Sequence, residues 1–209
     1  KGNVELTNFS IPQEMFTKLP LKTKFSKFNG KFKFLADFNS FNGEISLENW
    51  DMETNKKIEL NGEWHFFWKK IITPEQIIRK GIPKNGGLIQ VPGLWSSLKD
   101  KNKNLSLGYG TYILKVKKLK SIGKIGFVLP YFATAFESYI IQGNQVFNLF
   151  RSGKVGMTKE TSIPKAVKKM TELNLRGDFY IVFHCSNFHY RSGGFFYSLS
   201  MGKAKIIKE

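Results

Sequence analysis

The chain has 209 residues, and 33 Lys and Arg against 16 Asp and Glu give it a formal net charge of +17. Aromatic residues make up 15% of the sequence, which excludes a disordered chain because disorder requires low hydrophobicity. No run approaches the roughly 18 apolar residues needed to cross a bilayer, and the single cysteine excludes an internal disulfide framework and any multi-cysteine metal site.

Residues 1–42 differ from the rest and are predicted to form an N-terminal extension. Phe32, Phe34, Ala36 and Phe38 recur at every second position of a Lys-rich stretch, which predicts a strand. We expect this partly stranded extension to pack on the main body. The turn dipeptide Asn42-Gly43 marks the start of the second part, residues 43–209.

Short strand-like runs recur through the second part, and most of them are bounded by Gly, Pro, Asn or Ser. Such spacing with few helices predicts an all-β fold, an antiparallel β-sandwich of the jelly-roll type. The runs are Glu44–Leu47, Lys57–Leu60, Glu63–Trp68, Leu88–Val91, Thr111–Lys118, Lys124–Leu129, Thr134–Ile141, Gln145–Phe150, Asp178–Ser186 and Phe195–Ile207.

One short helix is clearly indicated within this β pattern. Thr73 is a favourable N-cap, Pro74 suits the first helical position, and Gln76 completes a capping box. Gly81 ends the helix. A second helix is predicted over the Lys-rich stretch Pro164–Thr171.

Catalytic motifs are largely missing from the sequence. It has no Gly-x-Ser-x-Gly elbow, no phosphate-binding Gly-rich loop ahead of a Lys, and no His-Glu-x-x-His pair. Cys185 falls on the apolar face of its predicted strand, so we expect a buried thiol and not a nucleophile. Glu63 and Glu137 are the only acids in otherwise apolar strands, and Glu137 is expected to anchor loop hydrogen bonds. We therefore predict a non-catalytic protein without a metal or cofactor.

Aromatic and polar residues gather in a few motifs. Trp64, Phe66 and Trp68 share one strand face and are predicted to be core residues. Trp95 follows the Pro92-Gly93 turn, where it would either stack on a sugar or close the core. The loop 186–194 combines an amide, an imidazole, aromatics and a cation beside two glycines, which favours binding over packing.

These motifs, taken in order, resemble a known family. The sequence is similar to the type-2 extracellular domain of bacterial seven-transmembrane receptors with diverse intracellular signalling modules. That domain is similar in turn to the galactose-binding-like, sugar-binding jelly roll of family-2 glycoside hydrolases. The resemblance runs from about Ile45 to Ile207, and leaves residues 1–42 outside. It rests on Leu60-x-Gly62-x-Trp64-x-Phe66-x-Trp68, Val91-Pro92-Gly93-x-Trp95, Gly108-Tyr109-Gly110-Thr111-Tyr112, Ser138–Ile141 before Gly143, Gly153-Lys154-Val155-Gly156, and Ser186-Asn187-Phe188-His189-x-Arg191-x-Gly193-Gly194.

The resemblance implies an extracytoplasmic sensor domain, on the periplasmic side of the inner membrane, that belongs to a membrane receptor. Its partners would be a small molecule, a carbohydrate or a related compound, and the membrane-embedded and cytoplasmic signalling modules of the same full-length chain. The ligand would dock among loops at one end of the sandwich. Trp95, Tyr109 and Tyr190 would stack on the ligand, and Arg151, Asn187, His189 and Arg191 would hydrogen-bond it.

Two other classes remain open at this stage. A protein-interaction module would show a flat, aromatic exposed surface without a pocket, and a carbohydrate-binding accessory module would adjoin a catalytic domain. A nucleic-acid partner is not expected, because the charge is carried mainly by Lys and the only arginines are Arg79, Arg151, Arg176 and Arg191.

Overall fold

The computed structural model describes residues 24–28, 31–35, 38–52, 56–98, 105–120 and 123–207. The chain divides into two compact units, Lys1–Phe38 and Asn39–Glu209. The predicted boundary at residue 42 falls four residues later than this division. The predicted packing of the extension on the main body lies outside the described residues.

The smaller unit contains one antiparallel hairpin, formed by β1 (Lys24–Phe28) and β2 (Lys31–Leu35). Its register pairs Lys24 with Leu35 and Phe28 with Lys31. The strand predicted from alternating Phe residues therefore forms over residues 31–35, and a second strand of the extension, residues 24–28, pairs with it.

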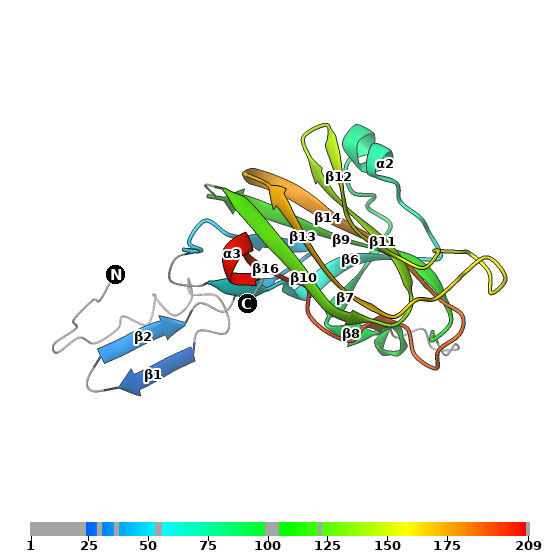
Figure 1. The fold of residues 1–209 in the computed structure, drawn as a ribbon, viewed down its shortest axis with the longest axis horizontal. Helices are drawn as coiled ribbons and strands as arrows, with labels where there is room; N and C mark the ends of the chain where they lie inside the picture. The colour runs from blue at the N-terminus through cyan, green and yellow to red at the C-terminus, as the bar shows by residue number, and fades with distance from the viewer. Residues whose placement is uncertain are drawn as a thin grey trace. The chain divides into compact units, whose positions relative to one another are not determined.

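The larger unit is built on an eight-stranded sheet (Figure 1). Six strands follow in the order β12-β11-β14-β9-β6-β3, while β4 pairs in parallel with β9, and β7 pairs antiparallel with β6. The strands are β3 (Asn39–Ser40), β4 (Glu44–Ser46), β6 (Asn61–Trp68), β7 (Gly87–Val91), β9 (Gly108–Leu119), β11 (Ala135–Gln142), β12 (Gln145–Ser152) and β14 (Gly177–Asn187).

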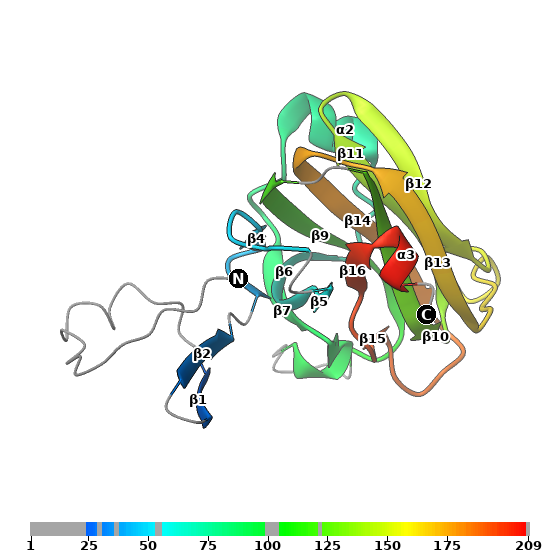
Figure 2. The same cartoon turned by 60° about the vertical axis from the view of Figure 1, so that its left-hand side comes forward.

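A four-stranded antiparallel sheet in the order β13-β10-β16-β5 lies against the larger one (Figure 2). The expected all-β antiparallel sandwich is thus confirmed. The strands of the small sheet are β5 (Lys57–Glu59), β10 (Lys124–Phe132), β13 (Val167–Asn174) and β16 (Ser200–Lys203). The short strands β8 (Gly93–Leu94) and β15 (Gly194–Phe195) pair antiparallel and join two loops. The 3₁₀ turn η1 (Trp95–Ser97) follows β8, and the helix α3 (Ala204–Ile207) follows β16.

The helix predicted over Pro164–Thr171 is wrong, because this stretch enters β13. Val167 to Asn174 pair antiparallel with β10 at the edge of the small sheet. Its lysines suggested a helix surface, but Lys on an edge strand equally protects that edge from pairing with other chains.

An aromatic core fills the space between the two sheets. Phe195 lies at its centre, with ring centroids 5.0 Å from those of Phe132 and Phe183, and 5.7 Å from that of Trp64. All four side chains are essentially buried. The predicted core role of the Trp64 stripe is confirmed for Trp64 and Phe66, whereas Trp68 is half-buried.

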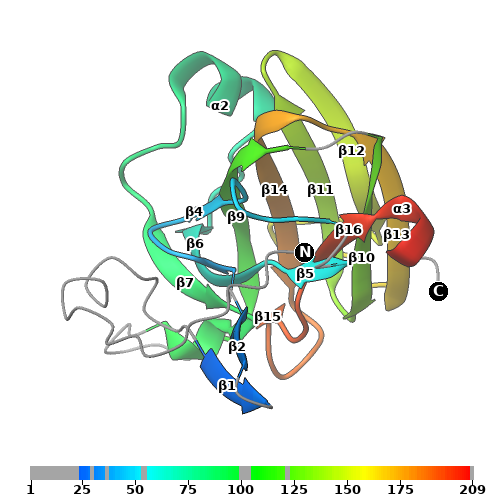
Figure 3. The ribbon, with the colours of Figure 1, turned by 90° about the vertical axis from the view of Figure 1, so that its left-hand side faces the viewer.

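A second apolar layer covers the outer face of the large sheet beneath α2 (Pro74–Lys80). The helix was predicted correctly, with the Thr73 hydroxyl accepting from the Gln76 amide and the reciprocal capping-box bond present. The isoleucines of this segment pack on the sheet in a cluster of buried side chains, Phe67, Ile72, Ile77, Ile113, Ile141 and Val182. Figure 3 shows α2 at the top of the sheet and the chain that follows it running down to β7.

No helix among the described residues is long and apolar enough to span a bilayer.

Candidate functional site

A row of polar side chains crosses the outer face of the large sheet. The strand registers place Thr111 opposite His184, His184 opposite Glu137, and Glu137 opposite Arg151. The row fixes the segment before α2: the Thr111 hydroxyl accepts from the Ile72 amide (3.0 Å). The same hydroxyl donates to the Lys70 carbonyl (2.8 Å).

His184 is buried in this row and also holds the same segment. Its Nε2 donates to the Ile72 carbonyl oxygen (2.8 Å), and its Nδ1 lies 3.5 Å from the Glu137 carboxylate. The contact with His184 holds the pKa of Glu137 below its ordinary value, against the opposing effect of burial. His184 therefore fixes the loop through Nε2, while Glu137 contacts the Nδ1 side of this histidine on the neighbouring strand. The loop contact expected of Glu137 is thus made by His184.

Cys185 lies on the opposite face of β14 and is fully buried. Burial in apolar surroundings raises the pKa of its thiol far above the ordinary value, which favours the neutral thiol over the nucleophilic thiolate. The residues that the structure describes contain no cluster of three or more His, Cys, Asp or Glu side chains suited to a metal ion.

Trp95 does not provide the ligand platform that was one of its two expected roles. Its side chain has no exposed surface, and the indole Nε1 donates to the Tyr112 hydroxyl oxygen (2.6 Å). The ring packs against Phe66 and Trp68, and its backbone amide donates to the Gly193 carbonyl. Trp95 instead closes the core, which was the other expectation.

Asn187 is also buried, and its hydrogen-bonding groups are already used. The side-chain amide donates to the carbonyls of Ser106 and Tyr190, and the side-chain oxygen accepts from the Tyr190 amide. Asn187 therefore holds its own loop in shape and has no free donor for a ligand in this conformation.

Three other predicted residues of this loop reach the surface. Tyr190 is 42% exposed, Arg191 is exposed, and the exposed His189 donates from Nε2 to the Ser162 carbonyl (2.9 Å). Tyr109 is half-buried on β9, one position along the ladder from the pair formed by Asn187 and Gly108. Arg151 lies apart from them, opposite Glu137 on β12.

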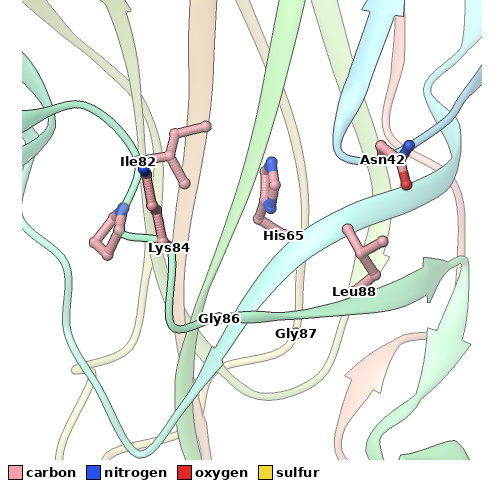
Figure 4. Close-up of a pocket in the computed structure, with 8 residues that line it drawn as sticks. Asn42, His65, Ile82, Lys84, Gly86, Gly87 and Leu88 are labelled. Atoms are coloured by element: carbon pink, nitrogen blue, oxygen red, sulfur yellow. The ribbon is translucent and has the colours of Figure 1, made fainter.

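None of the seven predicted residues lines any of three cavities formed by described residues. The largest of the three is an open groove of about 580 Å³ on the outer side of β6. Figure 4 shows His65 between the loop carrying Ile82 and Lys84, on one side, and Leu88 and Asn42, on the other. The groove is lined by Asn42, His65, Ile82, Pro83, Lys84, Gly86, Gly87 and Leu88.

Two smaller cavities flank this region of the sheet. One of about 360 Å³ lies beside the aromatic residues Phe66 and Trp68, and another of about 390 Å³ lies between α2 and the start of β14. The polar side chains of the first are Lys70 and Asn85, and those of the second are Lys115, Asp178 and Tyr180. The His65 groove is larger than both and is the one of the three that an imidazole lines. Asn42 and Lys84 are its other polar side chains, and the remaining walls are apolar or glycine, as in sites for small molecules.

His65 is the residue of this groove that sequence analysis missed. It is half-buried, and its ring makes no hydrogen bond to any described residue. Burial lowers its pKa below the ordinary 6.5, and the nearby Glu44 carboxylate partly opposes this. Its position between Trp64 and Phe66 gave one available signal, because alternation turns His65 to the face opposite the aromatic stripe.

No protein-family model and no curated protein sequence matches the chain. Its fold is similar to parts of solved glycosidases at low identity. Ruminococcus gnavus β-glucuronidase gives 14% identity and a TM-score of 0.47 over 70% of this chain and 28% of that chain. A β-glucuronidase from an uncultured Clostridium sp. has 11% identity and a TM-score of 0.46, over 69% of this chain and 28% of that chain.

A third structure, a GH2 β-galacturonidase from Eisenbergiella tayi bound to galacturonate, gives 13% identity and a TM-score of 0.42 over 70% of this chain and 24% of that chain. The chain thus spans about a quarter of the length of these enzymes. The likeness concerns the β-sandwich fold and carries no statement about activity.

Proposed function

We propose that the chain is a non-catalytic ligand-binding module, which takes a small molecule, a carbohydrate or a related compound, in the His65 groove. The observation that carries this proposal is the groove itself. Its volume of about 580 Å³ lies within the range of roughly 300–1,000 Å³ common for small-molecule sites. A half-buried imidazole without a described hydrogen-bond partner offers one donor and one acceptor to a hydroxyl-rich ligand.

The proposed context is the extracytoplasmic, sensory part of a bacterial membrane receptor. The six motifs ordered along the chain support this reading, since they resemble that receptor family. In such a receptor, a ligand that binds one conformation of the module better than another would bias the attached membrane helices. The non-catalytic role is supported by the contacts of His184 with a loop and with Glu137 and by the buried thiol of Cys185.

One observation favours a second candidate, a protein-interaction module. The rings of Tyr131 and Tyr197 meet edge to face at 6.4 Å, and the two residues are 47% and 53% exposed. Phe196, which precedes Tyr197 in the chain, is 42% exposed. Exposed aromatic side chains are enriched at protein interfaces. This surface and the groove are made of different residues, so variants can distinguish the two functions.

The test is a thermal-shift screen of the purified chain against neutral and acidic sugars, followed by calorimetric titration of each hit. A ligand that binds only the folded state raises the melting temperature. We expect His65→Ala to abolish the shift and His189→Ala to leave it unchanged, because His189 is an exposed histidine outside the groove. A hit that survives His65→Ala but is lost in Arg191→Ala would move the site to the loop 186–194.

A further inference from the structure

We infer that the ligand of the His65 groove carries an anionic group, a carboxylate or a phosphate, which lies between His65 and Lys84. The remainder of the ligand would rest on Ile82, Pro83 and Leu88. This inference rests on the proposed ligand-binding function and narrows its ligand class.

The charge of the groove lining is the first argument. The lining contains one Lys and one His but no Asp or Glu. Lys84 is exposed and forms no ion pair with a described residue. A carboxylate or phosphate bound beside Lys84 would gain a charge-assisted hydrogen bond, which is stronger than a bond between neutral groups.

The acidic side chains near His65 are the second argument, because they are already neutralised or bonded. Glu44 follows the turn that packs on the ring, and it forms ion pairs with Lys115 (3.3 Å) and with Lys117. Glu63 lies two residues before His65 on the same face of β6, and its carboxylate accepts from the Asn42 amide (2.9 Å). Glu44 is thus paired with two lysines and Glu63 is hydrogen-bonded at Asn42, and neither carboxylate lines the groove where the anion would bind.

The setting of the ring is the third argument. The backbone of Gly43 lies directly over the imidazole, since a Cβ at this glycine would be 2.2 Å from Cδ2 of His65. His65 also lines the groove, so its ring is accessible to a molecule bound there. An anion that approaches this half-buried imidazole favours the protonated ring, because opposite charges in a desolvated place interact strongly.

Binding should therefore depend on pH. Burial lowers the pKa of His65 in the free protein, whereas a bound anion raises it. Affinity for the anion is then highest below the pKa of the free protein, and falls as the pH rises through the pKa of the complex. For each unit by which the ligand raises the pKa of His65, the affinity at low pH exceeds the affinity at high pH by roughly tenfold.

The experiment uses three probes with the same sugar ring: D-glucose, D-glucuronate and D-glucose 6-phosphate. Their affinities are measured by calorimetry between about pH 5 and pH 8, where His titrates, and the His65 pKa is followed by NMR with and without each probe. We expect at least one anionic probe to bind at least tenfold more tightly than glucose, to raise the His65 pKa and to bind more weakly at pH 8. The two anionic probes distinguish a carboxylate ligand from a phosphate ligand.

Matched variants remove one positive charge inside or outside the groove. Lys84→Met should reduce the affinity of the anionic probe to that of glucose, whereas Lys159→Met, at an exposed site outside the groove, should leave it unchanged. If glucose and both anions bind with equal affinity, and His65→Ala abolishes this binding, the inference is overturned and the proposed function is retained. Failure of both anions to bind also overturns it, while a neutral hit in the wider screen would still support the proposed function.

Discussion

The indole Nε1 of Trp95 donates a hydrogen bond of 2.6 Å to the hydroxyl of Tyr112, and neither side chain has exposed surface. Trp95 begins the 3₁₀ turn η1 after β8, while Tyr112 comes from the middle of β9. This contact ties a loop to the central strand of the large sheet. It also makes Trp95 a structural residue in a position where a binding residue was one expectation.

Tyr112→Phe should lower the free energy of unfolding by about 1–3 kcal/mol, because it leaves the buried indole N–H without an acceptor. The measurement is chemical denaturation of the variant and the wild type. Tyr131→Phe is the matched control, since the Tyr131 ring is 47% exposed and surface substitutions usually change stability by less than about 0.5 kcal/mol. Equal stability of Tyr112→Phe and the wild type would contradict the structural role of this bond.

The sequence predicted the strands well because alternation and turn residues are local signals. Glu63–Trp68 and Asp178–Ser186 fall inside β6 and β14, where one face is apolar and a glycine lies at or next to the start of the strand. The same signals failed at residues 164–171, since a Lys-rich run suits both a helix surface and an edge strand. They also failed after Phe195, where the predicted single strand is two short strands and a helical turn.

The candidate site was less predictable because it depends on contacts between distant segments. Three segments of the chain form the groove: Asn42 before β4, His65 on β6, and residues 82–88. No local sequence pattern predicts that these segments come together. Likewise, the loop position of Trp95 did not predict its hydrogen bond to Tyr112, which is 17 residues further along the chain. The exposed positions of Tyr190 and Arg191 agree with the loop character that the sequence indicated.

Thr111→Val should release the segment that leads into α2. The hydroxyl of Thr111 bonds to both Ile72 and Lys70, and the loss of the acceptor leaves a buried backbone N–H unsatisfied. We expect a loss of about 1–3 kcal/mol in unfolding free energy and faster hydrogen exchange at residues 70–80. Thr111→Ser keeps the hydroxyl and should restore most of the stability. A valine variant as protected from exchange as the wild type would refute the anchoring role.

The stability of the protein should fall in acid partly through Glu137. His184 holds the pKa of this carboxyl below its ordinary 4.5 in the folded state. A lowered folded-state pKa contributes stability that is present above the unfolded pKa, and is lost as the pH falls through the folded pKa. Glu137→Gln should therefore be less stable than the wild type at pH 7, and the difference should shrink below about pH 4.5. Urea denaturation across this range is the measurement, and a constant difference would contradict it.

Gly43→Ala tests how the turn before β4 shapes the groove. Gly43 has φ +72°, a left-handed conformation, and an added Cβ would lie 2.2 Å from the His65 ring. Gly143→Ala is a matched control, because Gly143 has φ +57° and nothing lies within 4 Å of its added Cβ. The control should lose roughly 1–2 kcal/mol from backbone strain alone, and Gly43→Ala should lose more.

The additional loss in Gly43→Ala should come from displacement of the imidazole, and a double variant can show this. In the His65→Ala background the clash is absent, so Gly43→Ala should then cost no more than Gly143→Ala. The difference between the two backgrounds measures the coupling of Gly43 and His65, since residues in contact give non-additive effects. A displaced ring would also lie in the groove, so Gly43→Ala should weaken the binding of any ligand found in the screen. Additive effects on stability together with unchanged affinity would show that Gly43 does not position His65.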